Sequence, residues 1–180
     1  MVQITISGHP GSGTSTLVKG LCEHFNWTSL NGGDIFRGEA KTRGMTLADF
    51  GEMCKEDLSV DKQLDEILMQ RMQEENGADV IESRLSGWWA YRLNLDCIRL
   101  WLHVDDEQRA KRVVAREGSD YQTAYSENAT RMKVDAERFD ILYGIQPADE
   151  EPYTHIVDAS QLDVQQVLES VIQILNEREE

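Results

Sequence analysis

The chain lacks any apolar run long enough to cross a membrane. None of its 180 residues falls in an uninterrupted apolar stretch of about 18, which argues against a membrane-spanning helix. The first apolar segment, residues 2–7, begins almost at the N-terminus, so we expect no signal peptide. No repeat, low-complexity tract or flexible linker divides the sequence. Its length therefore predicts one domain with a well-buried core.

Cysteine is scarce. The three cysteines, Cys22, Cys54 and Cys97, lie far apart and form no C-x-x-C pair. This spacing argues against a disulfide framework and against a zinc site, and it favours reduced thiols in a cytoplasmic protein.

Lysine is also scarce, with six lysines against twelve arginines, and the formal net charge is −15. So acidic a chain repels nucleic-acid backbones and anionic lipid, which argues against either partner. The charge is compatible with a nucleotide bound in a local cationic pocket. It fits an ordinary acidic cytosolic protein or a protein adapted to high salt, because salt screens self-repulsion. Nothing in the sequence marks an apolar seam, so a monomer is the default expectation.

A glycine-rich segment follows the first apolar run. It meets the P-loop pattern G-x-x-x-x-G-K-[ST] at Gly8, Gly13 and Ser15, but Thr14 stands where the lysine should be. Glycines let backbone N–H groups cradle phosphate oxygens, and the following helix offers its positive end. Because the segment joins a strand to an apolar-faced helix, we predict a phosphate site in preference to an ordinary turn. The predicted ATP-binding residues are Gly8, His9, Pro10, Gly11, Ser12, Gly13, Thr14, Ser15 and Thr16.

Two side chains near this loop have alternative interpretations. The Ser15 hydroxyl occupies the position that binds Mg²⁺ in P-loops. His9 could contact a phosphate, although a side chain facing solvent is the simpler expectation.

Hydrophobic periodicity predicts strands that alternate with helices. The strands are expected at residues 2–7, 27–30, 79–82, 98–104 and 155–158, and the helices at 13–25, 34–43, 46–55, 60–75, 105–118, 119–143 and 164–175. Asp34 and Ser119 are expected to cap two of these helices. The alternation predicts an α/β fold with three layers, in which helices cover both faces of a five-stranded parallel sheet. Ligands of such sheets bind at the carboxyl ends of the strands, where the glycine-rich loop would lie.

Six arginines fall where this order of elements would bring them toward one cleft. They are Arg37, Arg84, Arg112, Arg116, Arg131 and Arg138. One such arginine is usually a solvated surface residue. Their recurrence beside strand ends favours a site for several phosphates, because the guanidinium fork is always charged and matches phosphate oxygens.

With these residues in view, the chain resembles the nucleoside monophosphate kinases, and most closely the archaeal type of cytidylate kinase. The similar segments are residues 4–16, 33–37, 43–45, 82–85, 87–88, 112–118 and 131–144. The resemblance implies a P-loop core (residues 1–33, 77–116 and 144–180), a helical insertion that binds the monophosphate (about 34–76) and a lid (about 117–130). It also implies transfer of the ATP γ-phosphoryl group to CMP and dCMP, with Mg²⁺ as cofactor.

The resemblance also implies roles for residues. Arg112, Arg116, Arg131 and Arg138 would act on the phosphates, and Asp34, Arg37, Arg84 and Asp135 would bind CMP. Glu82 would hold a water on the metal, with a helix or turn cap as its alternative role. Thr14 lacks the usual ammonium charge, so an arginine from the lid would take over part of its work.

Several alternatives remain open at this stage. The acceptor could instead be UMP, AMP or a small alcohol such as shikimate, or the chain could be a nucleotide-binding module with little catalytic power. Trp88 and Trp89 could stack on a base, although packing at the sheet is the more frequent use. The methionines at Met45, Met53, Met69 and Met72 are expected to pack in the core.

Overall fold

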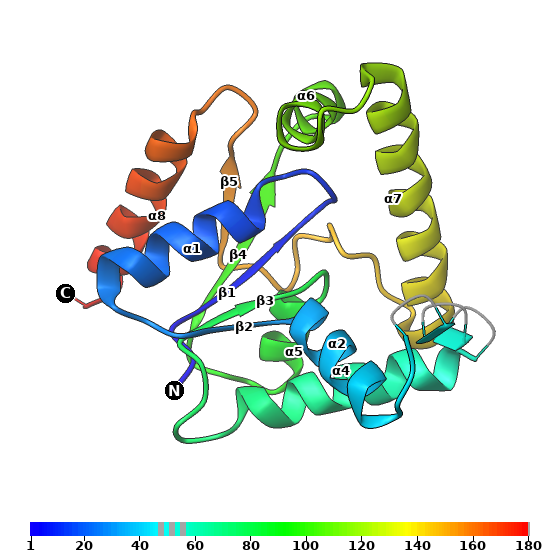
Figure 1. Ribbon diagram of the computed structural model, residues 1–180. Helices are drawn as coiled ribbons and strands as arrows, with labels where there is room; N and C mark the ends of the chain where they lie inside the picture. Colours follow the sequence, from blue (N-terminus) through cyan, green and yellow to red (C-terminus); the bar gives the residue numbers. More distant parts are fainter. Residues whose placement is uncertain (47–48, 51–52, 55–56, 180) are drawn as a thin grey trace.

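The fold is a parallel sheet with helices on both of its faces (Figure 1). The computed structural model describes residues 1–46, 49–50, 53–54 and 57–179. The strands are β1 (Ile4–Gly8), β2 (Ser29–Asn31), β3 (Val80–Glu82), β4 (Ile98–His103) and β5 (His155–Asp158). They are ordered β2-β3-β1-β4-β5, and every adjacent pair is parallel. The predicted α/β class and five-stranded sheet are confirmed.

The helices of the described residues connect and cover these strands. They are α1 (Thr14–Phe25), α2 (Gly32–Thr42), α4 (Leu58–Met72), α5 (Ser86–Arg92), α6 (Asp106–Glu117), α7 (Tyr121–Tyr143) and α8 (Val164–Glu179). None of them is long and apolar enough to cross a membrane. Of the helix predicted at residues 46–55, positions 47–48, 51–52 and 55 lie outside the described residues, while residues 49–50 and 53–54 are helical.

Two separate cores hold the sheet between its helical layers. On one face, Ile4 and Ile6 of β1 pack with α1 and α8, which lie side by side in Figure 1. On the other face, Ile81 of β3 packs with α4 and with the tryptophans of α5. Both tryptophans are buried, so the expectation that at least one packs in the core is confirmed for Trp88 and Trp89.

Helix α5 was missed by the sequence prediction. Its residues Ser86, Gly87, Trp88, Trp89 and Ala90 are all buried. A short helix that is covered on nearly every side has no polar face, so it shows no amphipathic period.

Two predicted helix caps are wrong by one to three residues. Asn31 caps α2, because its Oδ1 accepts the Asp34 N–H at 2.9 Å, and Asp34 lies inside the first turn. Asp120 caps α7, because its carboxylate accepts the Thr123 N–H at 3.0 Å, and Ser119 precedes the cap. In both cases several adjacent residues can cap, and only the chain geometry selects one.

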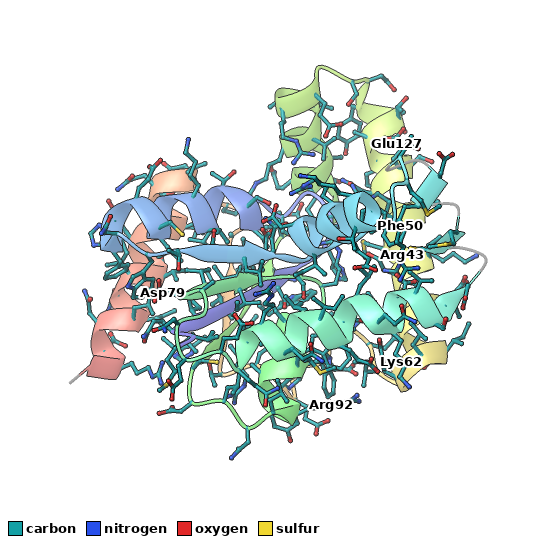
Figure 2. The ribbon with its side chains drawn as sticks, turned by 60° about the horizontal axis from the view of Figure 1, so that its bottom comes forward. Arg43, Phe50, Lys62, Asp79, Arg92 and Glu127 are labelled. Carbon is teal, nitrogen blue, oxygen red and sulfur yellow. The ribbon has the colours of Figure 1, made fainter. Side chains whose placement is uncertain are left out.

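The segment between the second and third strands has a small core of its own. Ala40, Phe50, Cys54 and Val60 are buried together, and the Phe36 and Phe50 rings lie 4.7 Å apart. Figure 2 labels Arg43 and Phe50, whose guanidinium carbon and ring centroid are 5.4 Å apart. These contacts join α2 to α4 independently of the sheet.

Candidate active site

The glycine-rich loop connects the buried strand β1 to α1. Gly11 and Gly13 have φ values of 84° and 90°, a region that side chains with a Cβ rarely enter. At Gly8, an added Cβ would lie 3.0 Å from both the Leu102 carbonyl oxygen and Thr14 Cγ2. The spacing of glycines in the sequence therefore reflects both backbone conformation and close packing.

Three arginines fix the orientation of this loop. The carbonyl oxygens of Gly8, Pro10 and Ser12 accept hydrogen bonds from Arg84 Nη1 (3.2 Å), Arg109 Nη1 (3.0 Å) and Arg112 Nη1 (2.6 Å). In a trans peptide the carbonyl and the following N–H point in opposite directions. Holding alternate carbonyls outward therefore turns the intervening N–H groups inward, as a phosphate-binding concavity requires.

Arg109 is the residue of this set that sequence reasoning missed. Its side chain is 1% exposed and also donates to the Val104 carbonyl (3.2 Å) and to Asp106 (2.5 Å). Arg109 lies three residues before Arg112 and seven before Arg116, so one face of α6 carries all three. This spacing could have identified Arg109, but only Arg112 and Arg116 were predicted from it.

Glu82, at the end of β3, contacts the first residues of α1. Its Oε1 accepts hydrogen bonds from the hydroxyls of Thr14 (2.5 Å) and Ser15 (3.0 Å). The alternative role of Glu82 as a helix or turn cap finds no support in these contacts. Mg²⁺ in nucleotide sites takes one or two protein oxygens and completes its shell with phosphates and water. The Ser15 hydroxyl and the Glu82 carboxylate, only 3.0 Å apart, fit that requirement. Within the described residues no cluster of three or more His, Cys, Asp or Glu offers another metal site.

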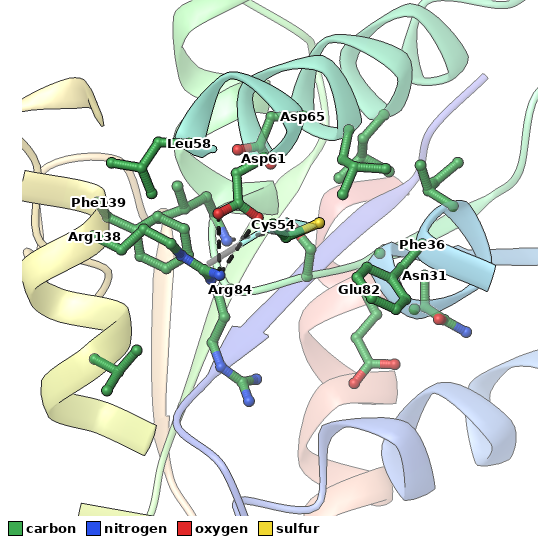
Figure 3. Close-up of a pocket in the computed structure, with 18 of the residues that line it drawn as sticks. Asn31, Phe36, Cys54, Leu58, Asp61, Asp65, Glu82, Arg84, Arg138 and Phe139 are labelled. Carbon is green, nitrogen blue, oxygen red and sulfur yellow. Dashed lines mark hydrogen bonds and ion pairs between the residues drawn. The ribbon is translucent and has the colours of Figure 1, made fainter. Parts of the chain in front are cut away.

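A pocket of about 880 Å³ opens beside this loop. It lies between α2, α4, α7 and the end of β3, and Figure 3 shows part of its lining. Its polar lining includes Ser15, Asn31, Arg37, Asp61, Asp65, Glu82, Ser83, Arg84, Glu137 and Arg138, and its apolar lining includes Ile35, Phe36, Leu58, Leu64, Leu68 and Phe139. A lining that combines charged and apolar side chains suits a nucleotide, because its phosphate is charged and its base is largely apolar.

A chain of alternating charges runs along this pocket. Arg84 Nε donates to Asp135 Oδ2 at 3.0 Å, and Arg138 Nη2 donates to Asp135 Oδ1 at 3.2 Å. Arg138 then pairs with Asp61 of α4 at 3.4 Å. Burial lowers the pKa of Arg84, whereas its pairing with Asp135 raises that pKa. These contacts bring Arg84 and Arg138, both predicted to face one cleft, together with Asp135, whose role was implied by the resemblance.

The other predicted arginines are arranged differently. Arg37 lines the pocket and pairs with Asp34 at 2.6 Å, while Asp34 itself is not among the lining residues. Arg112 donates to the Ala159 and Leu162 carbonyls as well as to the loop. Arg116 is exposed and pairs with Glu117, and Arg131 is exposed on α7.

His9 does not face solvent as expected. Its ring packs edge-on against Trp101 with centroids 4.9 Å apart, and it is half-buried. Burial, with the nearby Arg109 and Arg84, lowers its pKa to about 4. The side chain is therefore neutral at physiological pH, and it packs the loop against Trp101 of β4.

The polar lining at α4 was also not anticipated. Trp89 Nε1 donates to Asp65 Oδ1 at 3.2 Å, and the Tyr143 hydroxyl donates to Oδ2 at 2.7 Å. Burial raises the pKa of Asp65 to about 6, although the two hydrogen bonds stabilise the ionised form and lower the pKa. Trp89 is packed in the core and does not line the cavity, so it contributes to the pocket only by orienting Asp65.

Comparison with known proteins adds independent findings. Residues 7–130 match the family described as AAA domain. The chain is 36% identical over 162 residues to a cytidylate kinase of Methanococcoides burtonii, covering 89% of each chain. It is 40% identical over 144 residues to a cytidylate kinase of Halobacterium salinarum, covering 79% of this chain and 72% of the other.

A solved structure is similar in fold alone. Shikimate kinase from Acinetobacter baumannii, in complex with shikimate, superposes with a TM-score of 0.65 over 99% of this chain and 94% of its own. The sequence identity is 13%, so the likeness bears on the architecture and not on the acceptor.

Proposed function

The chain belongs to the archaeal cytidylate kinase family of P-loop kinases, and from this we propose that it transfers the γ-phosphoryl group of ATP to CMP and to dCMP. The products would be ADP and CDP or dCDP. The names of the relatives support CMP over UMP, AMP or a shikimate-like alcohol. The observation that carries the proposal is one continuous site, in which an arginine-braced loop adjoins a pocket lined by Arg37, Arg84 and Arg138.

In this proposal the loop holds the ATP phosphates. Backbone N–H groups between Gly8 and Thr16 would bind the β- and γ-phosphate oxygens, aided by the positive end of α1. The Thr14 hydroxyl is bonded to Glu82 and brings no positive charge. Arg84 and Arg112, which are already bonded to the loop, would supply positive charge in place of the missing lysine.

Ser15 and Glu82 would hold Mg²⁺, with Glu82 acting directly or through a water. The ion, when bound, neutralises charge that develops between the transferring phosphates.

The acceptor would lie in the pocket with its phosphate toward the loop. Arg37 and Arg84 would bind that phosphate, and Asp135, already bonded to Arg84, would lie near the sugar. Asp34 would act by orienting Arg37. No general base is needed, because the attacking group is already an anion and catalysis is positioning with charge stabilisation.

The insertion at residues 34–76 and the lid at about 117–130 would enclose the two nucleotides. In such a movement the small core shared by α2 and α4 would keep these two helices together, although Leu68 and Met72 of α4 also pack in the core of the sheet. Arg116 and Arg131 are exposed on α6 and α7, so closure would be needed to bring them to the transferring phosphate. Water would be excluded in the same movement.

An acceptor panel tests the proposal. Steady-state ADP release is measured with ATP and Mg²⁺ and with CMP, dCMP, UMP, AMP or shikimate in turn. We expect fast release with CMP and dCMP and none when Mg²⁺ is chelated. ATP binding without acceptor-dependent ADP release would instead indicate a nucleotide-binding module.

A further inference from the structure

The pocket contains a carboxylate that the proposed function leaves without a role. Asp61 of α4 is only 13% exposed, and Arg138 Nη1 lies 3.4 Å from it (Figure 3). Asp61 Oδ2 lies 3.4 Å from Arg138 Nη1 as an ion pair, but among the described residues it accepts no hydrogen bond, and Arg138 Nε donates none. Buried polar atoms are nearly always satisfied, so an acceptor and a donor without hydrogen bonds on two ion-paired side chains indicate that a ligand completes them.

The charge chain shows at which end of the pocket these atoms lie. Arg84 contacts the P-loop carbonyl of Gly8, Asp135 follows Arg84, Arg138 follows Asp135, and Asp61 comes last. Asp61 is therefore separated from the phosphate loop by three successive side chains. A group recognised there is remote from the acceptor phosphate.

The pocket also offers apolar walls that suit a flat aromatic ring. Leu58 and Leu64 line it from the same helix as Asp61, and Phe139 lines it from α7. The Arg138 guanidinium carbon lies 4.7 Å from the centroid of the Phe139 ring. Apolar walls with a few fixed polar groups are the usual environment of a bound base.

Resting on the proposed function, we propose that Asp61 is the residue that selects cytosine, by accepting a hydrogen bond from its exocyclic amine. Arg138 donates to the neighbouring ring nitrogen of the same edge. Together they present an acceptor beside a donor, the complement of the cytosine edge.

Uracil has the opposite pattern at the two positions that matter. A carbonyl oxygen replaces the amine, so it would face the Asp61 carboxylate with no hydrogen between them. The ring nitrogen carries a hydrogen that would face the Arg138 guanidinium. A site whose buried polar groups are left unpaired by the wrong substrate rejects that substrate strongly.

Asp65, one helical turn further along α4, provides a matched control. It also lines the pocket, but both of its oxygens already accept hydrogen bonds, from Trp89 and Tyr143. Its two oxygens are therefore each held by an aromatic side chain, whereas Asp61 Oδ2 accepts no hydrogen bond from the described residues. Its replacement is expected to affect all acceptors alike.

The first test is the ratio of kcat/KM for CMP to that for UMP. Asp61→Asn keeps the shape of the side chain but offers an amide that can turn its NH₂ toward the uracil carbonyl. We expect the ratio to fall by roughly 10- to 100-fold, the range of one hydrogen bond to a charged group. Asp65→Asn should leave the ratio unchanged. An unchanged ratio in Asp61→Asn would overturn the assignment, as would a change confined to the ratio of dCMP to CMP, which would assign Asp61 to the sugar.

A second test separates direct contact from a structural effect. Pyrimidin-2-one riboside monophosphate is a CMP analogue that lacks only the exocyclic amine. In the wild type its kcat/KM should be about 10- to 100-fold below that of CMP, and in Asp61→Ala the two should be nearly equal. Equal penalties in both proteins would refute the contact even if Asp61→Ala is unstable, because each protein is its own reference. If the contact with Asp61 is wrong, the wild type still turns over CMP. If the proposed function is wrong, the wild type shows no turnover of CMP.

Discussion

Arg109 lies beneath the phosphate loop with its guanidinium bonded to the Pro10 and Val104 carbonyls and to Asp106. Arg109→Met keeps much of the side-chain volume but removes the donor from the Pro10 and Val104 carbonyls, which belong to buried residues. We expect the free energy of unfolding to fall by about 2–4 kcal/mol, measured by urea denaturation. The control is Arg116→Met on the same helix, which removes only an exposed pair with Glu117 and should change stability by less than about 0.5 kcal/mol. Similar urea midpoints for the two variants would contradict this account.

Arg131 should show the opposite behaviour, a loss of turnover without a loss of stability. It is exposed on α7, so Arg131→Ala should leave the thermal midpoint unchanged. If its charge stabilises the transferring phosphoryl group after closure, kcat should fall by roughly 10²-fold or more. Lys133→Ala, also exposed on α7, is the matched control and should keep its rate. Near-normal turnover in Arg131→Ala would show that this charge has no part in catalysis.

His9 predicts a pH dependence of stability. Its pKa is about 4 in the folded chain against an ordinary value of 6.5, so between these pH values the unfolded chain binds the proton more tightly. The stabilisation is therefore fully present above about pH 6.5 and is lost as the pH falls toward 4. His9→Gln cannot titrate, so the difference in unfolding free energy between wild type and variant should rise with pH across this window and be flat above it. A difference that does not vary with pH would show that the ring is not held neutral by its surroundings.

At the scale of elements, the contact between α5 and the loop before β5 leaves no space for a side chain at Gly87. An added Cβ would overlap the ring of Tyr153. Gly87→Ala should therefore lower the free energy of unfolding by about 1–3 kcal/mol, as overpacking does in other cores. Gly38, inside α2, has nothing within 4 Å of an added Cβ, so Gly38→Ala should stabilise by about 0.5–1 kcal/mol. Denaturant midpoints that move in the same direction for both variants would refute the packing argument.

The elements that could be predicted from the sequence are those with a strong local signal. The five strands, the glycine-rich loop and α1 follow from apolar runs and from the positions of Gly8 and Gly13. Helix α5 could not be predicted, because its burial on nearly every side removes the period on which prediction depends.

The candidate site divides in the same way. Arg84 and Arg138 could be proposed from their places in the order of elements and Asp135 from the family resemblance, and the structure brings the three into one chain of charges. Asp61 and Asp65 could not, because their significance depends on α4 facing α7, a contact between residues more than 70 positions apart. The hydrogen bond from Arg109 to the Pro10 carbonyl could not be predicted either, because it also joins residues far apart in the sequence.

At the scale of the whole molecule, the net charge of −15 should make stability depend on salt. Raising KCl from 0.1 M to 1 M shortens the screening length from about 10 Å to about 3 Å, which weakens repulsion among surface carboxylates. We expect the thermal midpoint to rise across that series at neutral pH. The same series near pH 5, close to the sequence pI of about 4.6, should give a smaller rise. Thermal midpoints that do not change with KCl at neutral pH would mean that repulsion among surface carboxylates does not destabilise the fold.

The central claim is that loop amides and converging guanidiniums enclose the phosphates of two nucleotides without an ammonium at position 14. A crystal structure with a bisubstrate analogue, adenosine and cytidine joined through a polyphosphate, tests it most directly. We predict phosphate oxygens within hydrogen-bond distance of the loop N–H groups and of Arg37, Arg84 and Arg131, with the cytosine against Asp61. Guanidiniums turned toward bulk solvent in that complex would contradict the account.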